Sequence, residues 1–300
     1  MTPAPWKPVL AVSITLVFWA SAFVAIRHLA DDFGPGAMAL GRLVVGAVCL
    51  TVIVVWSRLR SRVRLVAPTP NQWWRIIAIG LLWYAVYMVA LNTGEHHVDA
   101  GTASLVLQLS PVVIAVLAAI FLDERFTRWI AIGLALAFLG VAIIALSSGG
   151  GADADGPVLG VLLCLVSVAA YSISLVLQKP LAGRIPALQL IWMACGIGAI
   201  ATLPWAGQLV HDLSEAPAAS ILWLVYLGVC PTAVAFTTYG YALQHLSASQ
   251  LGISTYVVPV ISIALAAVLL GEAPAPLAYV GGVVALAGVW VARRRPRAIA

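Results

Sequence analysis

Aromatic and polar side chains recur inside long apolar stretches of this sequence. In an apolar surrounding, amides and hydroxyls should face the interior of a helix bundle, where hydrogen-bonding partners remain available. Rings and amides can also hold small organic molecules, through ring faces and hydrogen bonds. We expect nine of these residues to line a substrate cavity: Trp19, Tyr84, Tyr87, Asn92, Gln108, Tyr171, Tyr239, Gln244 and Tyr256.

Two prolines lie near the starts of similar apolar stretches, Pro111 and Pro259. A proline inside a helix removes one backbone hydrogen bond and frees the carbonyl four residues earlier, here those of Leu107 and Thr255. In lipid a freed carbonyl must find protein, water or ligand. We interpret the prolines as paired kinks beside the cavity, serving as hinge, ligand acceptor or both. Kinks that serve packing alone are the alternative.

Charged residues are scarce within these stretches, and none of them is an Asp, Glu or Lys near the middle. Glu124 and Glu272 end two equivalent stretches, where each can pair with the amino-terminal amides of the next helix, so we predict structural roles. Arg42 is predicted to snorkel outward or to meet a structural partner, in preference to a substrate carboxylate. The pattern favours an uncoupled carrier of neutral or zwitterionic solutes. A proton route through Glu95 or His97 stays open.

Other chemistry has little support in the sequence. Four cysteines stand alone in different apolar stretches, without metal or disulfide spacing. Residues 95–99, Glu-His-His-Val-Asp, form one loose cluster, which we interpret as a solvated loop because adjacent histidines point apart on a helix. We predict no catalytic residues, no metal and no cofactor. A multispan enzyme acting on lipid-linked substrates is the alternative.

The composition places these residues in a membrane. Hydrophobic residues make up 63% of the 300 residues and charged ones 9%, against about half and one quarter in soluble domains. A spanning helix needs about 20 apolar residues, and lipid requires helices because the backbone must be satisfied internally. Ten segments qualify: 9–28, 36–56, 74–93, 99–122, 128–146, 157–177, 185–205, 219–243, 247–270 and 275–292. The sequence thus predicts an all-α integral membrane protein.

Loop charges orient these segments. With the amino terminus in the cytoplasm, every Lys and Arg except Arg27 and Arg42 falls on the cytoplasmic side, as the positive-inside rule requires. Both termini are then cytoplasmic, and a bacterial inner membrane is expected. The pI of about 9.2 reflects these loops, so no nucleic-acid partner is predicted.

The sequence contains an internal repeat. Residues 110–124 read SPVVIAVLAAIFLDE and residues 258–272 read VPVISIALAAVLLGE, with seven of fifteen positions identical at an offset of 148. Gln108 and Tyr256 are equivalent positions. We divide the chain into a first repeat (1–147), a linker (148–156), a second repeat (157–292) and a basic tail (293–300). Five helices are an odd number, so the second repeat is inverted. Inverted repeats around a central cavity are typical of secondary transporters.

Several motifs resemble a known family. Residues 102–111 (TASLVLQLSP), 121–125 (FLDER) and 19–27 (WASAFVAIR), with Gly133 and Gly140, are similar to the EamA family of the drug/metabolite transporter superfamily. Ala20 stands where that family usually has glycine, and Arg27 where it usually has lysine. The resemblance implies ten helices, a central cavity and transport of small metabolites, often export. Bacterial members of similar layout include exporters of amino acids, but the family pattern does not fix the substrate.

We therefore expect a secondary transporter that exports small neutral or zwitterionic metabolites, with amino acids, including aromatic ones, as the expected class. Carriers of nucleobases, sugars or drugs are alternatives. The expected partners are a small-molecule substrate and the lipid bilayer, and a monomer should suffice for function. Five glycines permit close helix contact, either within the chain or between protomers: Gly133, Gly140, Gly281, Gly282 and Gly288.

Overall fold

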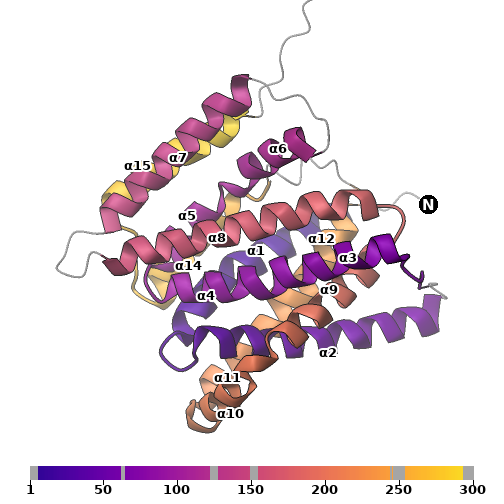
Figure 1. Ribbon diagram of the computed structural model, residues 1–300. Helices are drawn as coiled ribbons and strands as arrows, with labels where there is room; N and C mark the ends of the chain where they lie inside the picture. Colours follow the sequence, from indigo (N-terminus) through magenta and orange to yellow (C-terminus); the bar gives the residue numbers. More distant parts are fainter. Residues whose placement is uncertain are drawn as a thin grey trace, which may run out of the picture.

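The computed structural model describes residues 6–61, 65–121, 128–148, 155–243, 245 and 254–292, which form helices and short connections without a strand (Figure 1). The first half contains α1 (Trp6–Leu29), α2 (Pro35–Ser61), α3 (Pro70–Ile79), η1 (Gly80–Val86), α4 (Tyr87–Glu95), α5 (Ala100–Leu107), α6 (Ser110–Phe121) and α7 (Arg128–Ser148). The second contains α8 (Asp155–Gln178), η2 (Lys179–Leu181), α9 (Ala187–Ala201), η3 (Leu203–Trp205), α10 (Ala206–Glu215), α11 (Ala218–Leu227), η4 (Gly228–Val234), α12 (Ala235–Leu243), α14 (Val257–Leu269) and α15 (Pro276–Ala292).

The helices have the lengths and surfaces of membrane spans. Six described helices are long and apolar enough to cross a bilayer, and a seventh span results if the bent pair α9 and η3–α10 counts as one. Three shorter apolar helices, α7, α14 and α15, bring the described segments to ten. Their outward faces are apolar, with Val52, Leu222 and Val283 each more than half exposed. Exposed apolar surface of this kind fits lipid and confirms the predicted fold class.

The two five-span repeats interlock. The first helix of each repeat packs against the third and fourth spans of the other, α1 on α12 and α14, and α8 on α4 and α6. The second helix of each repeat packs against the third span of the other repeat, α2 against η4 and α9 against η1. Figure 1 shows the resulting bundle, in which α1 and α8 run between elements of the opposite repeat. The space at the centre is therefore bounded by both repeats.

The third span of each repeat contains a π-helical segment, which the sequence analysis did not predict. These segments, η1 and η4, begin at Gly80 and Gly228, again separated by 148 residues. A Cβ on Gly80 would lie 2.7 Å from Ile197 Cβ, and one on Gly228 would lie 2.5 Å from Val45 Cβ. Each glycine thus presses a π segment against the second helix of the other repeat. Segments of this type are rare and often mark functional sites.

The fourth span of the first repeat is broken before its proline. Helix α5 ends at Leu107 and α6 begins at Ser110, one residue before Pro111. The Ser110 hydroxyl donates to the freed Leu107 carbonyl at 2.7 Å. The Gln108 amide Nε2 donates to the freed Thr255 carbonyl at 2.8 Å. Side chains therefore donate to both carbonyls, that of Thr255 also accepting from the Val258 nitrogen at 3.0 Å, and the bond from Gln108 joins the two repeats.

Helices α7 and α15 lie along each other at one side of the molecule (Figure 1). Glycines make the approach possible, because a Cβ on Gly140 would lie 2.5 Å from the Gly281 carbonyl and one on Gly288 would lie 2.6 Å from the Ala137 nitrogen. Gly133 of α7 likewise lies against Gly288 and Ala292 of α15, while Gly282 lies against Leu105 on α5. These glycines thus serve packing within the chain, one of the two alternatives considered above.

The second span of the second repeat bends by 50° between α9 and η3–α10. The bend contains Pro204, and it is followed by a helix where the sequence predicted only a loop. The Trp205 ring and the Gln208 amide lie against Gly36 and Gly34, and Asp212 Oδ2 accepts a hydrogen bond from the Gly34 nitrogen at 2.9 Å. Helix α10 therefore covers the start of α2.

Candidate functional site

A cavity of about 290 Å³ lies between the repeats. It is lined by α1, α2, η1, α4, α5, α6, α8, α12 and α14, together with residues 108 and 255. Ligand pockets in proteins typically range from about 300 to 1,000 Å³ and are mostly apolar. The cavity therefore has room for a small metabolite, and both repeats contribute to its wall.

Aromatic rings form one wall of the cavity. Trp19 lies 5.0 Å from Tyr239 and 5.9 Å from Phe236, measured between ring centroids. On the other side, Trp83 lies 5.2 Å from Tyr171 and 5.0 Å from Phe236. Phe236 thus joins the two groups, and Tyr87 extends the wall at 6.0 Å from Tyr171. Ring pairs at these separations are favourable and hold one another in place.

Non-aromatic polar residues cover a smaller part of the wall, namely Arg42, Ser104, Gln108, Ser110 and Thr255. Both serine hydroxyls donate to backbone carbonyls of their own helix turn, those of Gly101 and Leu107. Gln108 donates its amide across to Thr255, as described above. Arg42 is the charged member of the described lining, with no acidic residue beside it in the wall.

The structure brings together most of the residues predicted to bind substrate. Trp19, Tyr87, Gln108, Tyr171 and Tyr239 line the cavity, and Pro111 lies beside them. Gln244 and Glu124 lie outside the described residues. Pro259 is buried within α14 and is not part of the lining.

The cavity wall does not include Tyr84, Asn92 and Tyr256, although the sequence predicted that they line it. The Tyr84 ring is fully buried against Trp83 and Phe236. The Asn92 amide donates to the Pro35 carbonyl at 3.0 Å and so fastens α4 to the start of α2. Trp83, the neighbour of Tyr84 in the π segment η1, lines the cavity in its place.

Arg42 does not snorkel. Its side chain is only 5% exposed, it lines the cavity, and its Nε donates to Thr232 Oγ1 at 2.9 Å. The expectation of a structural partner is therefore met, while the expectation of outward extension is wrong. Its isolation as a charge inside a span was the signal in the sequence, but the partner lies 190 residues away.

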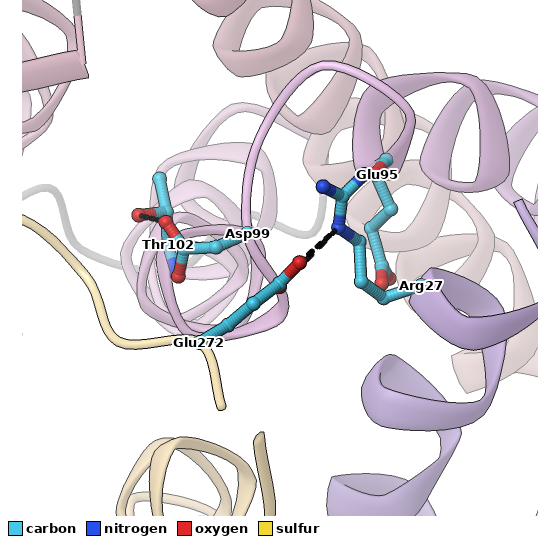
Figure 2. A network of polar contacts seen from close by, with 5 residues as sticks. All are labelled: Arg27, Glu95, Asp99, Thr102 and Glu272. Carbon is cyan, nitrogen blue, oxygen red and sulfur yellow. Dashed lines mark hydrogen bonds and ion pairs between the residues drawn. The ribbon is translucent and has the colours of Figure 1, made fainter. Parts of the chain in front are cut away.

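A polar network lies at one end of the bundle, where α1, α4 and the segment after α14 meet (Figure 2). Where the structure describes the chain, the Glu272 carboxylate makes no capping bond to the following helix. Its carboxylate accepts from Arg27 Nε at 2.9 and 3.3 Å. Arg27 Nη1 also donates to the Glu95 carbonyl at 3.1 Å. Asp99 caps α5 through the nitrogen and hydroxyl of Thr102. The ion pair between Arg27 and Glu272 joins the two repeats. It lies next to Ile26, which lines the cavity.

The cluster at residues 95–99 is not a solvated loop throughout. The Glu95 side chain is fully buried, and neither of its carboxylate oxygens has a hydrogen-bond partner. Partial burial, with the charges of His97 and Arg27, lowers the pKa of His96. Among the described residues, no group of three His, Cys, Asp or Glu is arranged to hold a metal ion.

The arrangement can now be compared with known proteins. The sequence profile described as the EamA-like transporter family matches residues 6–146 and 158–294. The chain belongs to this family. Two matches in tandem correspond to two repeats, so the EamA-like chain has the ten helices of that family as two inverted halves around the cavity. It is a multi-pass membrane transporter of small molecules.

Relatives of this EamA-like transporter include a probable terminal-alkyne amino-acid exporter of Streptantibioticus cattleyicolor, 39% identical over 96% of this chain and 94% of the relative. An uncharacterized transporter of Bacillus subtilis is 30% identical over 92% of this chain and 88% of its own. A probable amino-acid metabolite efflux pump of Escherichia coli is 27% identical over 72% of this chain and 73% of its own. A crystal structure covers 97% of both chains with a TM-score of 0.62 at 20% identity, which supports the fold alone.

Proposed function

We propose that this transporter exports amino acids, including aromatic ones, from the cytoplasm of a bacterial cell. The observation that carries the proposal is the cavity between the repeats, which combines a wall of aromatic rings with one buried cation. An amino acid presents a carboxylate and a compact side chain that suit such a surface. Two relatives carry names that refer to export of amino acids or their metabolites.

Within this proposal, Trp19, Tyr87, Tyr171 and Tyr239 contact the substrate side chain and Gln108 offers a polar group. Trp83 joins them as a residue that the sequence analysis missed. Gln244 also remains a proposed substrate-binding residue. Tyr84, Asn92 and Tyr256 act indirectly, by supporting the helices that carry the lining.

Alternating access is the proposed mechanism. The Arg27–Glu272 ion pair closes the bundle between the repeats beyond the cavity. With both termini cytoplasmic in the inner membrane, that end faces the periplasm, and substrate leaves when the pair separates. The paired prolines Pro111 and Pro259 are the proposed hinges, since the fourth span is already broken beside the first of them.

The test is transport by the purified protein in liposomes. Labelled amino acids are offered with and without a pH gradient, and we expect saturable counterflow without the gradient. Trp19→Ala should reduce the rate at least about tenfold, because it removes a large ring from the cavity wall. Trp6→Ala is the matched control, since Trp6 lies on the same helix but is 59% exposed.

Absence of counterflow for every amino acid would contradict the substrate class and would move the panel to nucleobases, sugars and drugs. Counterflow that requires the pH gradient would contradict an uncoupled carrier. Direction is tested separately in cells loaded with a labelled amino acid, where expression should speed its release.

A further inference from the structure

Arg42 is a buried cation, and the part of the chain that the structure describes places no counter-ion in contact with it. A charge inside a spanning segment is costly unless it is paired or hydrogen-bonded. Among the described residues, Arg42 makes one side-chain hydrogen bond, to Thr232, and no ion pair within 4.0 Å. Arginine has five N–H donors. The four on its terminal nitrogens thus have no acceptor from the described chain, although the side chain lines the cavity.

The π segment η4 holds Arg42 in this position. Thr232 Oγ1 donates to the Leu227 carbonyl five residues earlier at 2.9 Å, which leaves its lone pairs toward Arg42 Nε. The backbones approach closely on both sides. A Cβ on Gly46 would lie 2.8 Å from Thr232 Cγ2, and one on Gly228 would lie 2.9 Å from the Arg42 carbonyl. The guanidinium is therefore anchored at one edge, and its other edge is unused.

The buried acid Glu95 does not occupy that edge. It acts on Arg42 electrostatically, and the other charged groups that act on Glu95 are Arg27, Asp99 and Glu272. Yet Glu95 is outside the cavity lining and shares no hydrogen bond with Arg42. The terminal N–H groups of Arg42 therefore remain available to an anion that enters the cavity.

We propose that the free edge of the Arg42 guanidinium binds the carboxylate of the substrate, while the remainder of the substrate packs against the aromatic wall. This inference rests on the proposed function and sharpens it to solutes with a free carboxylate. Guanidinium and carboxylate match in geometry and can form two parallel hydrogen bonds. Amines, esters and amides of the same size carry no carboxylate anion and should bind more weakly.

A purely structural arginine, held only by Thr232, would make a different prediction. The cavity would then select ligands by size and apolar surface, and removal of the substrate carboxylate would have little effect on binding. The two interpretations can therefore be separated with ligands alone, before any residue is changed.

The experiment is a binding titration of the purified protein, followed by the fluorescence of its tryptophans, two of which line the cavity. The probes are L-phenylalanine, 3-phenylpropionate and L-phenylalaninamide. We expect the first two to bind, and the amide to bind at least about tenfold more weakly, because a hydrogen-bonded charge contributes a factor of about 10 to 100. Equal affinity for acid and amide would overturn the proposal.

Variants then assign the effect to the residue. Arg42→Gln should weaken both carboxylates by a similar factor and leave the amide unchanged, and Arg42→Lys should retain part of the preference. Arg58→Gln is the control on the same helix, since Arg58 is exposed. An equal loss for all three ligands in Arg42→Gln would contradict the proposal. If that variant fails to fold, the ligand series and Arg42→Lys decide.

Liposome transport distinguishes this inference from the proposed function. Arg42-dependent carboxylate binding without movement of labelled phenylalanine or any other amino acid would refute amino-acid export and leave the anchor intact. Transport of phenylalanine and its amide at equal rates, unchanged in Arg42→Gln, would refute the anchor and leave the carrier function intact.

Discussion

Single residues at the cavity are held by partners far away in the sequence. Trp19 meets Phe236 and Tyr239, and Arg42 meets Thr232, always across the two repeats. Each of these lining side chains is therefore positioned by the half of the molecule to which it does not belong. Substitution of a partner residue should therefore change the position of the lining side chain, even when the partner itself does not line the cavity.

Thr232→Val tests this dependence. The substitution preserves shape but removes the hydroxyl that accepts from Arg42 Nε, so a buried donor loses its only protein partner among the described residues. We expect a loss of about 1–3 kcal/mol in the free energy of unfolding, measured by denaturation of the purified protein. Thr232→Ser keeps the hydroxyl and should stay within about 1 kcal/mol of the parent, the size of one buried methyl group. The reverse order of stability would show that the methyl group, not the hydroxyl, matters.

At the scale of the elements, apolar length and the repeat could be predicted from the sequence, but local helix type could not. Runs of about 20 apolar residues have few alternatives in lipid, and an identity such as Pro111 with Pro259 marks equivalent helices. The π segments have no distinctive composition, so the exchange of Trp83 for Tyr84 at the cavity was missed. The bend at Pro204 and the Arg27–Glu272 pair depend on tertiary contacts that no single segment contains.

The broken fourth span supports a prediction of its own. Pro111→Ala restores a backbone donor that can complete the turn to Leu107, so α5 and α6 can join into a continuous helix. We expect thermal stability to be equal or higher and counterflow in liposomes to fall several-fold, because the hinge is stiffened. Pro35→Ala is the control, since a proline in the first turn of α2 removes no helical bond. Unchanged counterflow in Pro111→Ala would argue for a packing kink.

Helices α7 and α15 carry a matched test of close packing. Gly140→Ala places a Cβ within 2.5 Å of backbone atoms of α15, so the pair must separate. We expect a loss of more than about 1 kcal/mol in unfolding free energy, followed by thermal denaturation. Gly196→Ala adds the same methyl group where nothing lies within 4 Å, and it should be neutral or slightly stabilising because alanine favours helix. Equal effects of the two substitutions would contradict the close packing of these helices.

For the whole molecule, the proposed alternating-access mechanism requires the pair between Arg27 and Glu272 to break (Figure 2). The pair joins the first helix of one repeat to the end of the fourth span of the other. Its side chains are about 30% exposed, so its contribution is modest and suited to a contact that opens repeatedly. Glu272→Gln should therefore shift the population toward a bundle open at this end, without unfolding it.

The shift can be measured with a thiol introduced by Ser104→Cys, a substitution at a buried lining position near that end. A membrane-impermeant maleimide is added to intact cells, and the rate of labelling is followed. Glu272→Gln should raise the labelling rate several-fold, and the exchange Arg27→Glu with Glu272→Arg should lower it again by restoring opposite charges. The parent chain with its four native cysteines sets the background. Equal labelling with and without Glu272→Gln would mean that other contacts keep this end closed, and the movement between the repeats would have to be sought at the opposite end of the bundle.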